Sequence, residues 1–244
     1  MLYCLPVSPA HSLRNCRLSH LFRNTKNRML SLPFIRSLTL PLALGLLASI
    51  ICLVIFASIA EELNEPQDTL LVFDAAFAQA FRADNPQALT FYRGLSFIGY
   101  QGLWIIGMIV GIYFLLKKHW LHLGLWIVTL LGGLVLNNLL KLLFARPRPE
   151  TRLIDVIAYS FPSGHAMMSM IGFGLLTYFL WRATHNAILR IFLVFGATLL
   201  VILVGISRLA LNVHYVSDVL AGFAAGGVWL LSCIIVANRI ARVE

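Results

Sequence analysis

Long apolar runs separated by short charged stretches dominate the pattern along this chain. In an apolar segment, a run of about 18 or more residues is typical of a membrane-spanning helix. Backbone N–H and C=O groups must pair with one another inside the hydrocarbon region, which favours helices over irregular structure. We therefore predict an all-α polytopic membrane protein with six transmembrane helices. The runs cover Leu38–Ala60, Gly94–Leu116, Trp120–Leu140, Gly164–Trp181, Ile191–Asn212 and Tyr215–Asn238.

The composition points to the same fold class. Of the 244 residues, 59% are hydrophobic and only 12% are charged, whereas about a quarter of the residues in a typical soluble domain are charged. These values argue against a soluble globular domain and against a disordered chain. The four cysteines lie in the N-terminal tail or inside apolar runs, so the sequence predicts no disulfide framework.

The distribution of Lys and Arg predicts the orientation in the membrane. Six spans place both termini on one side, and the segments on that side carry 12 basic residues and one acid. The segments on the other side carry seven basic and nine acidic residues. Because cytoplasmic segments are enriched in Lys and Arg, both termini are expected in the cytoplasm. The net charge of +9 then reflects topology, and no nucleic-acid partner is expected.

The N-terminal part divides into a tail and an anchor. Residues 1–37 are expected to form a basic cytoplasmic tail with poor order, and the start of translation is either Met1 or Met29. Residues 38–60 are expected to be the first transmembrane helix. This run is longer than the roughly 7–15 apolar residues of a signal peptide, which favours an uncleaved anchor over a cleaved signal.

An outward loop over residues 61–93 follows the first span. Its apolar residues recur at helical spacing, with polar residues such as Asp74 between them. This pattern is typical of an amphipathic helix in the membrane interface, and a lid packed on the outer face is the alternative. The apolar positions are Leu70, Phe73, Phe77 and Phe81.

Ionisable groups at membrane depth are costly and mark functional sites, and three clusters of them stand out. The first cluster follows the third span and contains Lys141, Arg146 and Arg148, with Pro147 and Pro149 between and after them. The prolines prevent a straight helix, so the chain can curl and bring the Lys141 ammonium and the Arg148 guanidinium together. Anchoring of the span at the interface is the alternative interpretation.

The second cluster is Pro162-Ser163-Gly164-His165 at the start of the fourth span. Proline is favoured at helix starts, Ser163 can cap the helix, and Gly164 leaves backbone N–H groups open. Such a helix N-terminus binds anions, and His165 can exchange a proton near neutral pH. The alternative is a capping serine beside a core histidine.

The third cluster comprises Ser207, Arg208, His214 and Asp218. His214 and Asp218 are four residues apart at the start of the sixth span, so they share one helix face. A carboxylate on one imidazole nitrogen leaves the other nitrogen free to act as a nucleophile. A buried pair that only satisfies its own hydrogen bonds is the alternative.

Together, the three clusters suit a phosphoryl group, and the predicted topology places all of them on the outward side. Lys141, Arg148 and Arg208 supply positive charges, and the start of the fourth span supplies N–H donors for the oxygens of a phosphoryl group in transfer. A Mg²⁺ site favours several carboxylates, but these motifs contain one carboxylate among three cations. We therefore expect no metal and no cofactor.

The three clusters closely resemble the signature of the type 2 phosphatidic acid phosphatase (PAP2) superfamily of integral membrane lipid phosphatases. The signature reads K-x6-RP, PSGH and SR-x5-H-x3-D, and this chain shows no departure from it. The resemblance covers about residues 61–240, and residues 94–240 are expected to form a PAP2-like catalytic helical core. The matching positions are Lys141…Arg148-Pro149, Pro162-Ser163-Gly164-His165 and Ser207-Arg208…His214…Asp218.

The resemblance implies a role for each of these residues. It implies that His214 attacks phosphorus to form a phosphohistidine, that Asp218 orients His214, and that His165 protonates the departing group and then activates water. It also implies that no metal is required. Asn137, one turn before Lys141, is our own addition as a supporting residue. The phosphate-binding residues that the resemblance implies are Lys141, Arg148, Ser163, Gly164 and Arg208.

The expected function is metal-independent hydrolysis of a lipid phosphate or diphosphate from the bilayer, with the active site at the outer face of the membrane. Undecaprenyl diphosphate is the favoured substrate, and phosphatidylglycerophosphate and phosphatidic acid are alternatives. A lipid phosphotransferase and a non-catalytic lipid-binding or transport protein are the competing functions, and the oligomeric state is left open. We expect a pH optimum bounded by two histidine titrations, because one imidazole must be neutral and the other protonated.

Overall fold

A computed structural model describes residues 40–63 and 69–241. The predicted tail over residues 1–37 and the choice between Met1 and Met29 lie outside these described residues. Within the described residues the chain is helical and contains no strand, which confirms the predicted all-α class. The chain divides into two compact units, Met1–Leu44 and Gly45–Glu244. The described part of the first unit is only the opening turn of helix α3 (Leu40–Glu62).

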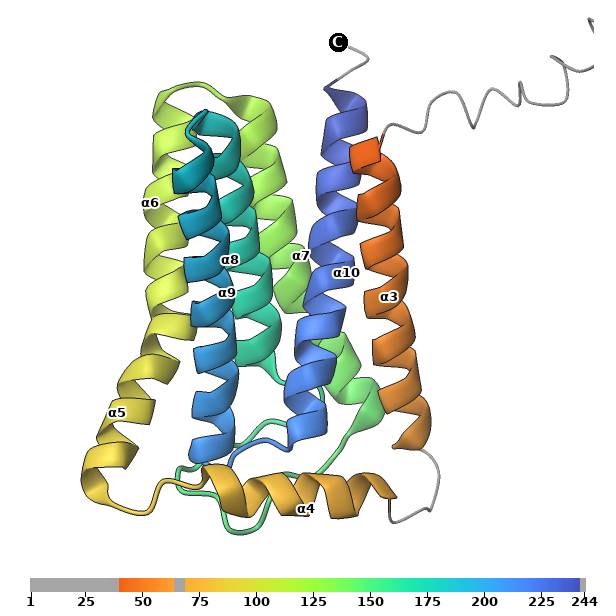
Figure 1. Ribbon diagram of the computed structural model, residues 1–244, viewed down its shortest axis with the longest axis vertical. Helices are drawn as coiled ribbons and strands as arrows, with labels where there is room; N and C mark the ends of the chain where they lie inside the picture. Colours follow the sequence, from red (N-terminus) through yellow and green to blue (C-terminus); the bar gives the residue numbers. More distant parts are fainter. Residues whose placement is uncertain (1–39, 64–68, 242–244) are drawn as a thin grey trace, which may run out of the picture. The chain divides into compact units, whose positions relative to one another are not determined.

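Six helical segments of the described chain are long and apolar enough to cross a membrane. Each coincides with one of the predicted spans, so the prediction of six transmembrane helices is confirmed and the chain is an integral membrane protein. Figure 1 shows these helices running alongside one another. They are α3, the continuous segment Pro86–Leu116, α7 (Trp120–Phe144), α8 (Gly164–Ala183), α9 (Ala187–Ala210) and α10 (Val216–Ile240).

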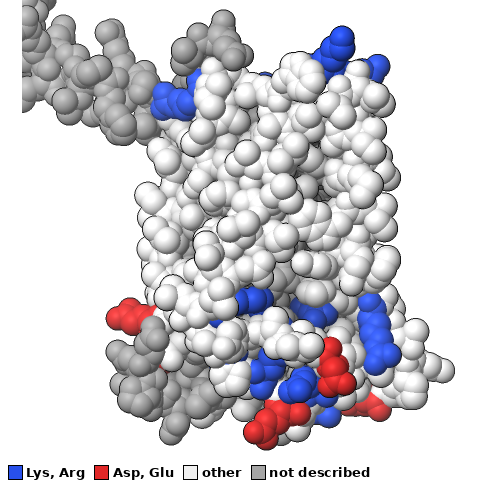
Figure 2. All heavy atoms as spheres, turned by 180° about the vertical axis from the view of Figure 1, so that it is seen from behind, with Lys and Arg blue, Asp and Glu red and all other residues white. Residues whose placement is uncertain are grey.

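Charged side chains avoid the middle of the helices. Figure 2 shows an uncharged band between two charged ends. The Asp and Glu side chains visible in this view lie at the end where helix α4 (Thr69–Phe81) lies in Figure 1, whereas Lys and Arg occur at both ends. Because charge is costly in hydrocarbon, the band marks the part of the surface that suits the bilayer core.

The second span begins at Pro86 rather than at the predicted Gly94, within the stretch expected to be loop. The Asn85 side chain accepts a hydrogen bond from the Ala88 N–H at 2.8 Å, and Pro86 occupies the first turn. Both features favour a helix start. The segment consists of α5 (Pro86–Phe97), a π-helical turn η1 (Ile98–Gly102) and α6 (Leu103–Leu116).

Helix α4 lies in the connection between the first two spans and crosses the ends of α9 and α10 (Figure 1). Asp74 on this helix is buried, with 1% of its surface exposed, whereas Val72 and Phe73 are exposed. One face of α4 therefore packs on the bundle and another stays open. The helix combines features of the packed lid and of the amphipathic interfacial helix.

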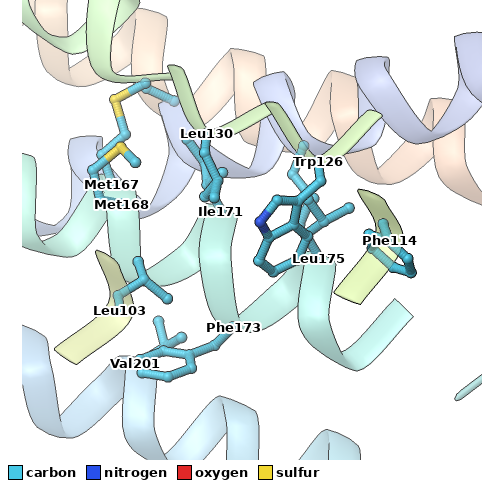
Figure 3. Close-up of a cluster of buried hydrophobic side chains, with 12 residues drawn as sticks. Leu103, Phe114, Trp126, Leu130, Met167, Met168, Ile171, Phe173, Leu175 and Val201 are labelled. Carbon is cyan, nitrogen blue, oxygen red and sulfur yellow. The ribbon is translucent and has the colours of Figure 1, made fainter. Parts of the chain in front are cut away.

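Helix α8 is the centre of the apolar core. Figure 3 shows its residues Met167, Ile171 and Leu175 packed between side chains of α6 and α7, including Leu103 and Trp126. All five of these side chains are buried. Because lipid tails are as apolar as these side chains, close van der Waals packing stabilises this core within the bilayer.

Close contact between α8 and α10 positions the third motif beside the second. A Cβ atom on Gly222 of α10 would lie 2.7 Å from the backbone oxygen of Ser163, so only glycine permits this approach. Small residues at helix crossings allow such close backbone packing in membrane proteins. As a result, the Ser163 N–H donates to the Asp218 backbone oxygen at 2.9 Å, and the two motifs meet.

Candidate functional site

The predicted site residues gather around one cavity of about 450 Å³. Its walls come from α5 and η1, the ends of α7 and α9, the start of α8, and the segments that precede α8 and α10. Six of the eight predicted residues line it, whereas Ser163 and Asp218 lie behind the wall. The six are Lys141, Arg148, Gly164, His165, Arg208 and His214.

His214 and Asp218 form the hydrogen-bonded pair that their spacing predicts. His214 Nδ1 lies 3.3 Å from Asp218 Oδ2, and both side chains are buried. The same oxygen accepts a hydrogen bond from the Tyr215 N–H at 3.0 Å and another from the Ser160 hydroxyl. These donors fix the carboxylate, which assigns the ring proton to Nδ1 and leaves Nε2 unprotonated, with its lone pair toward Arg148.

Arg148 faces the other nitrogen of the same ring. Its Nη1 lies 3.1 Å from His214 Nε2 and donates to the Val213 carbonyl at 2.6 Å. Its Nε donates to the Ala158 carbonyl at 2.6 Å. The guanidinium is thus held where a phosphoryl group on Nε2 would develop negative charge, the position in which a cation favours phosphoryl transfer.

The environment of His214 favours its neutral form. Burial lowers the pKa of His214 well below its ordinary value, and the neighbouring charges of Arg148, Arg208 and Lys141 lower this pKa further. Both causes disfavour the charged imidazolium. At neutral pH the ring is therefore uncharged and able to act as a nucleophile.

We expect the lowered pKa of His214 to set the acid side of the pH profile of kcat/KM. As pH falls, kcat/KM decreases only when His214 takes up a proton, so the half-maximal point lies below the value of about 6.5 for an unperturbed histidine. The measurement is kcat/KM from pH 4 to 9 with two substrates whose phosphates differ in pKa, because a substrate titration moves with the substrate. An enzyme-derived half-maximal point at or above 6.5 would contradict the assignment.

Lys141 and Arg208 add two further cations to the cavity. Lys141 Nζ donates to the carbonyls of Tyr159 at 2.6 Å and Ser160 at 3.3 Å. Arg208 is only 3% exposed, and it donates to the Ser96 hydroxyl. Its Nε finds no hydrogen-bond partner within the described chain. Because buried polar groups are nearly always paired, this N–H is available to a bound anion or to a water molecule.

The cavity walls contain no acidic side chain among the described residues, although Arg93 adds a fourth cation. Within residues 40–63 and 69–241, no three His, Cys, Asp or Glu side chains are grouped so as to hold a metal ion. The cavity therefore offers positive charge and N–H donors. These groups suit a phosphate better than they suit a cation.

The start of α8 differs in one respect from the expectation. The Ser163 hydroxyl is fully buried and accepts from the Ala166 N–H at 3.5 Å, so this side chain caps the helix and does not line the cavity. Gly164 does line it, and a Cβ atom there would lie 2.9 Å from Asn137 Oδ1. His165 stacks on Tyr100 of η1 with ring centroids 4.6 Å apart. The structure thus places Asn137 beside the first turn of α8.

Two charged residues next to the site were not among the predicted site residues. Arg146 contacts Asp218 at 2.6 Å and Asp74 at 2.8 Å, and all three side chains are buried. The motif contains two arginines, Arg146 and Arg148, and sequence alone did not show what Arg146 binds. For Asp74, the available signal was an acid within the apolar pattern of α4.

Comparisons with known proteins agree on one family. The family model of the PAP2 superfamily matches residues 122–242, a range that contains all eight predicted site residues. Among curated proteins, phosphatidylglycerophosphatase B of Bacillus subtilis (strain 168) is 36% identical over 120 residues, which is 46% of this chain and 56% of that protein. The match therefore spans little more than half the length of that relative.

Two crystal structures have a similar fold. A transmembrane PAP2-type phosphatidylglycerolphosphate phosphatase from Bacillus subtilis matches with a TM-score of 0.71 and 27% identity, over 80% of this chain and 98% of that chain. LpxE from Aquifex aeolicus matches with a TM-score of 0.51 and 20% identity, over 68% and 94% of the respective chains. At the identity of the second match, the likeness concerns the fold alone.

Proposed function

We propose a function from one premise: the chain belongs to the PAP2 superfamily. The protein acts as a metal-independent phosphatase that releases inorganic phosphate from lipid phosphates or diphosphates through a phosphohistidine intermediate. The observation that carries this proposal is the placement of His214. One ring nitrogen faces the buried Asp218 carboxylate, and the other faces a cavity with cationic walls.

In the first half of the reaction, the His214 Nε2 lone pair attacks phosphorus. The bond between phosphorus and the lipid oxygen breaks, and its electron pair stays on that oxygen. His165, from the same cavity wall, gives its proton to the departing oxygen. Arg148, Lys141 and Arg208 offset the negative charge of the phosphoryl oxygens during transfer, while Asp218 stabilises the positively charged ring.

In the second half, His165 is neutral and takes a proton from water. The water oxygen attacks phosphorus, and the bond from phosphorus to Nε2 breaks. The electron pair returns to His214, phosphate leaves, and His165 is again protonated. Each histidine thereby ends the cycle in its starting state, as acid–base catalysis requires.

We place the cavity on the outward side of a bacterial inner membrane, with both termini in the cytoplasm. The unequal distribution of Lys and Arg supports this orientation. The lipid headgroup would then meet the cavity at the outer surface while the chains stay in the bilayer.

The relatives and the cavity together suggest which lipids to test. The curated match and the crystal structure from Bacillus subtilis are both named for phosphatidylglycerophosphate, and undecaprenyl diphosphate is the substrate favoured from the sequence. Both lipids carry a second phosphate, unlike phosphatidic acid. Arg93 is exposed and lines the same cavity, so it can bind that second phosphate. We therefore propose a substrate with two phosphate groups.

The test is phosphate release by the detergent-purified protein from a panel of lipids, with and without EDTA. We expect release from phosphatidylglycerophosphate or undecaprenyl diphosphate to exceed release from phosphatidic acid and undecaprenyl monophosphate, and EDTA to leave the rates unchanged. The His214→Asn protein serves as the blank. A rate abolished by EDTA and restored by Mg²⁺ would contradict metal independence, and no release from any lipid would contradict the phosphatase.

A further inference from the structure

We infer that Asp74 and Arg146 are positioning residues of the catalytic histidine, acting on His214 through Asp218. The inference rests on the proposed function, since it concerns the same histidine. Asp74 belongs to α4, outside the three motifs and outside residues 122–242 that match the family model. A helix at the edge of the bundle would therefore supply part of the catalytic machinery.

Arg146 bridges two buried carboxylates. Its Nη1 donates to Asp218 Oδ1 at 2.6 Å, and its Nη2 donates to Asp74 Oδ2 at 2.8 Å. Exposure of these side chains is 9% for Arg146, 1% for Asp74 and 0% for Asp218. Solvent therefore screens these charges only weakly, and each fixes the geometry of the next.

Ser217 ties Asp74 to the start of α10. The Ser217 N–H donates to Asp74 Oδ1 at 2.9 Å, and the Ser217 hydroxyl donates to Asp74 Oδ2 at 2.6 Å. The hydroxyl oxygen also accepts from Arg146 Nη1 at 2.8 Å. A carboxylate bonded to a free N–H in the first turn stabilises a helix start. Asp74 thereby holds the turn that carries Asp218.

The two oxygens of Asp218 have separate partners. Oδ2 faces His214 and accepts from the Tyr215 N–H and the Ser160 hydroxyl. For Oδ1, Arg146 is the donor that the described chain supplies. Arg146 also lies 4.0 Å from the centre of the Tyr215 ring, and its carbonyl accepts from the Ser160 N–H at 2.9 Å. Loss of Arg146 would free one end of the carboxylate and loosen its other contacts.

The combined charge of Asp74, Arg146 and Asp218 suits the phosphohistidine intermediate better than it suits the resting enzyme. Asp74, Arg146 and Asp218 together carry one net negative charge, while resting His214 is neutral. When Nε2 forms its bond to phosphorus, the ring becomes positive and the four groups become neutral overall. Interactions that strengthen along the reaction raise kcat. The Asp74 charge is therefore expected to favour the phosphohistidine step.

Asp74→Asn tests this inference because it removes the charge and keeps the shape of the side chain. We expect kcat to fall about 10- to 100-fold, by analogy with residues that orient the ligands of a metal, with KM within about twofold of the wild type. The acid side of the kcat/KM profile should move to lower pH, since loss of a negative charge disfavours protonation of His214. The other charged or titratable groups facing His214 stay in place: Lys141, Arg148, His165, Arg208 and Asp218.

Three matched variants separate positioning from a structural effect. Ser217→Ala removes the hydroxyl's hydrogen bonds to Asp74 and from Arg146 without changing charge, so it should lower kcat without moving the acid side of the profile. Asp84→Asn changes an exposed acid in the turn after α4 and should leave kcat and the acid side of the pH profile unchanged. Arg146→Lys keeps the charge but cannot bridge both carboxylates, so it should lower kcat at constant KM. If the Asp74→Asn protein does not fold, Arg146→Lys takes its place as the test.

The outcomes distinguish this inference from the proposed function. General destabilisation by Asp74→Asn would lower kcat equally at every pH by reducing the folded fraction, and such a result would overturn the inference. A kcat within twofold of the wild type and an unshifted pH profile would also overturn the inference. Activity of the wild-type protein in the same assay would still support the proposed phosphatase function. A wild-type protein inactive on all four lipids would instead overturn the proposed function.

Discussion

His214→Asn abolishes phosphate release from every lipid substrate, with an expected loss in kcat of at least about 10³-fold, as for other covalent nucleophiles. The asparagine amide has no basic lone pair that can attack phosphorus, so no covalent intermediate forms. The fold should persist because Asp218 keeps its bonds to Arg146, to Ser160 and to the Tyr215 N–H.

Two measurements check this prediction. Phosphate release gives the rate, and rapid quenching with labelled substrate traps the phosphoprotein, which for phosphohistidine is stable in base and labile in acid. His185→Asn is the matched control, since His185 is exposed in the turn between α8 and α9 and should retain activity and label. A labelled protein in the His214→Asn variant would mean that another residue is the nucleophile.

Arg208→Gln should have the second-largest effect on activity, with a fall in kcat of about 10²- to 10³-fold, as when one oxyanion donor is removed. Arg208 is buried and lines the cavity, and its Nε has no partner within the described chain. The same features predict the opposite effect on stability. Removal of a buried cation with an unpaired N–H relieves a desolvation cost, so the thermal midpoint without ligand should stay constant or rise.

Thermal unfolding in the presence of orthophosphate or vanadate separates the role of Arg208 in anion binding from its effect on stability. An anion that binds the folded protein raises its thermal midpoint, and we expect this rise in the wild type but not in Arg208→Gln. Arg182→Gln is the matched control, because Arg182 is exposed and bonded to Tyr178 and Asn238 away from the cavity. Equal stabilisation of the wild type and Arg208→Gln by the anion would contradict a role for Arg208 in phosphate binding.

The six spans were predictable because the thickness of a bilayer sets the length of an apolar run. Their exact bounds depended on local capping that the apolar pattern does not contain. The start at Pro86, for example, follows from the hydrogen bond between the Asn85 side chain and the Ala88 N–H. The π-helical turn Ile98–Gly102 was also not predicted, yet it carries Tyr100 to the His165 ring.

Much of the site was predictable for a similar reason, since its residues lie in three short motifs. The spacing of four between His214 and Asp218 places them on one face, and the prolines after Lys141 end its helix near the place expected. The spacing was less informative for Ser163, whose hydroxyl caps α8 and lies outside the cavity. A serine at this position can cap the helix or contact a ligand, and local sequence does not distinguish these roles.

The six spans and the three positively charged motifs could be predicted from the sequence, because each depends on composition or on short spacing. The residues that support the motifs depend on how the helices pack together. Asp74 and Arg146 are 72 positions apart, and no local spacing relates them. They meet because α4 packs across the ends of α9 and α10. In that buried position a charge needs an opposite partner, and Arg146 supplies it.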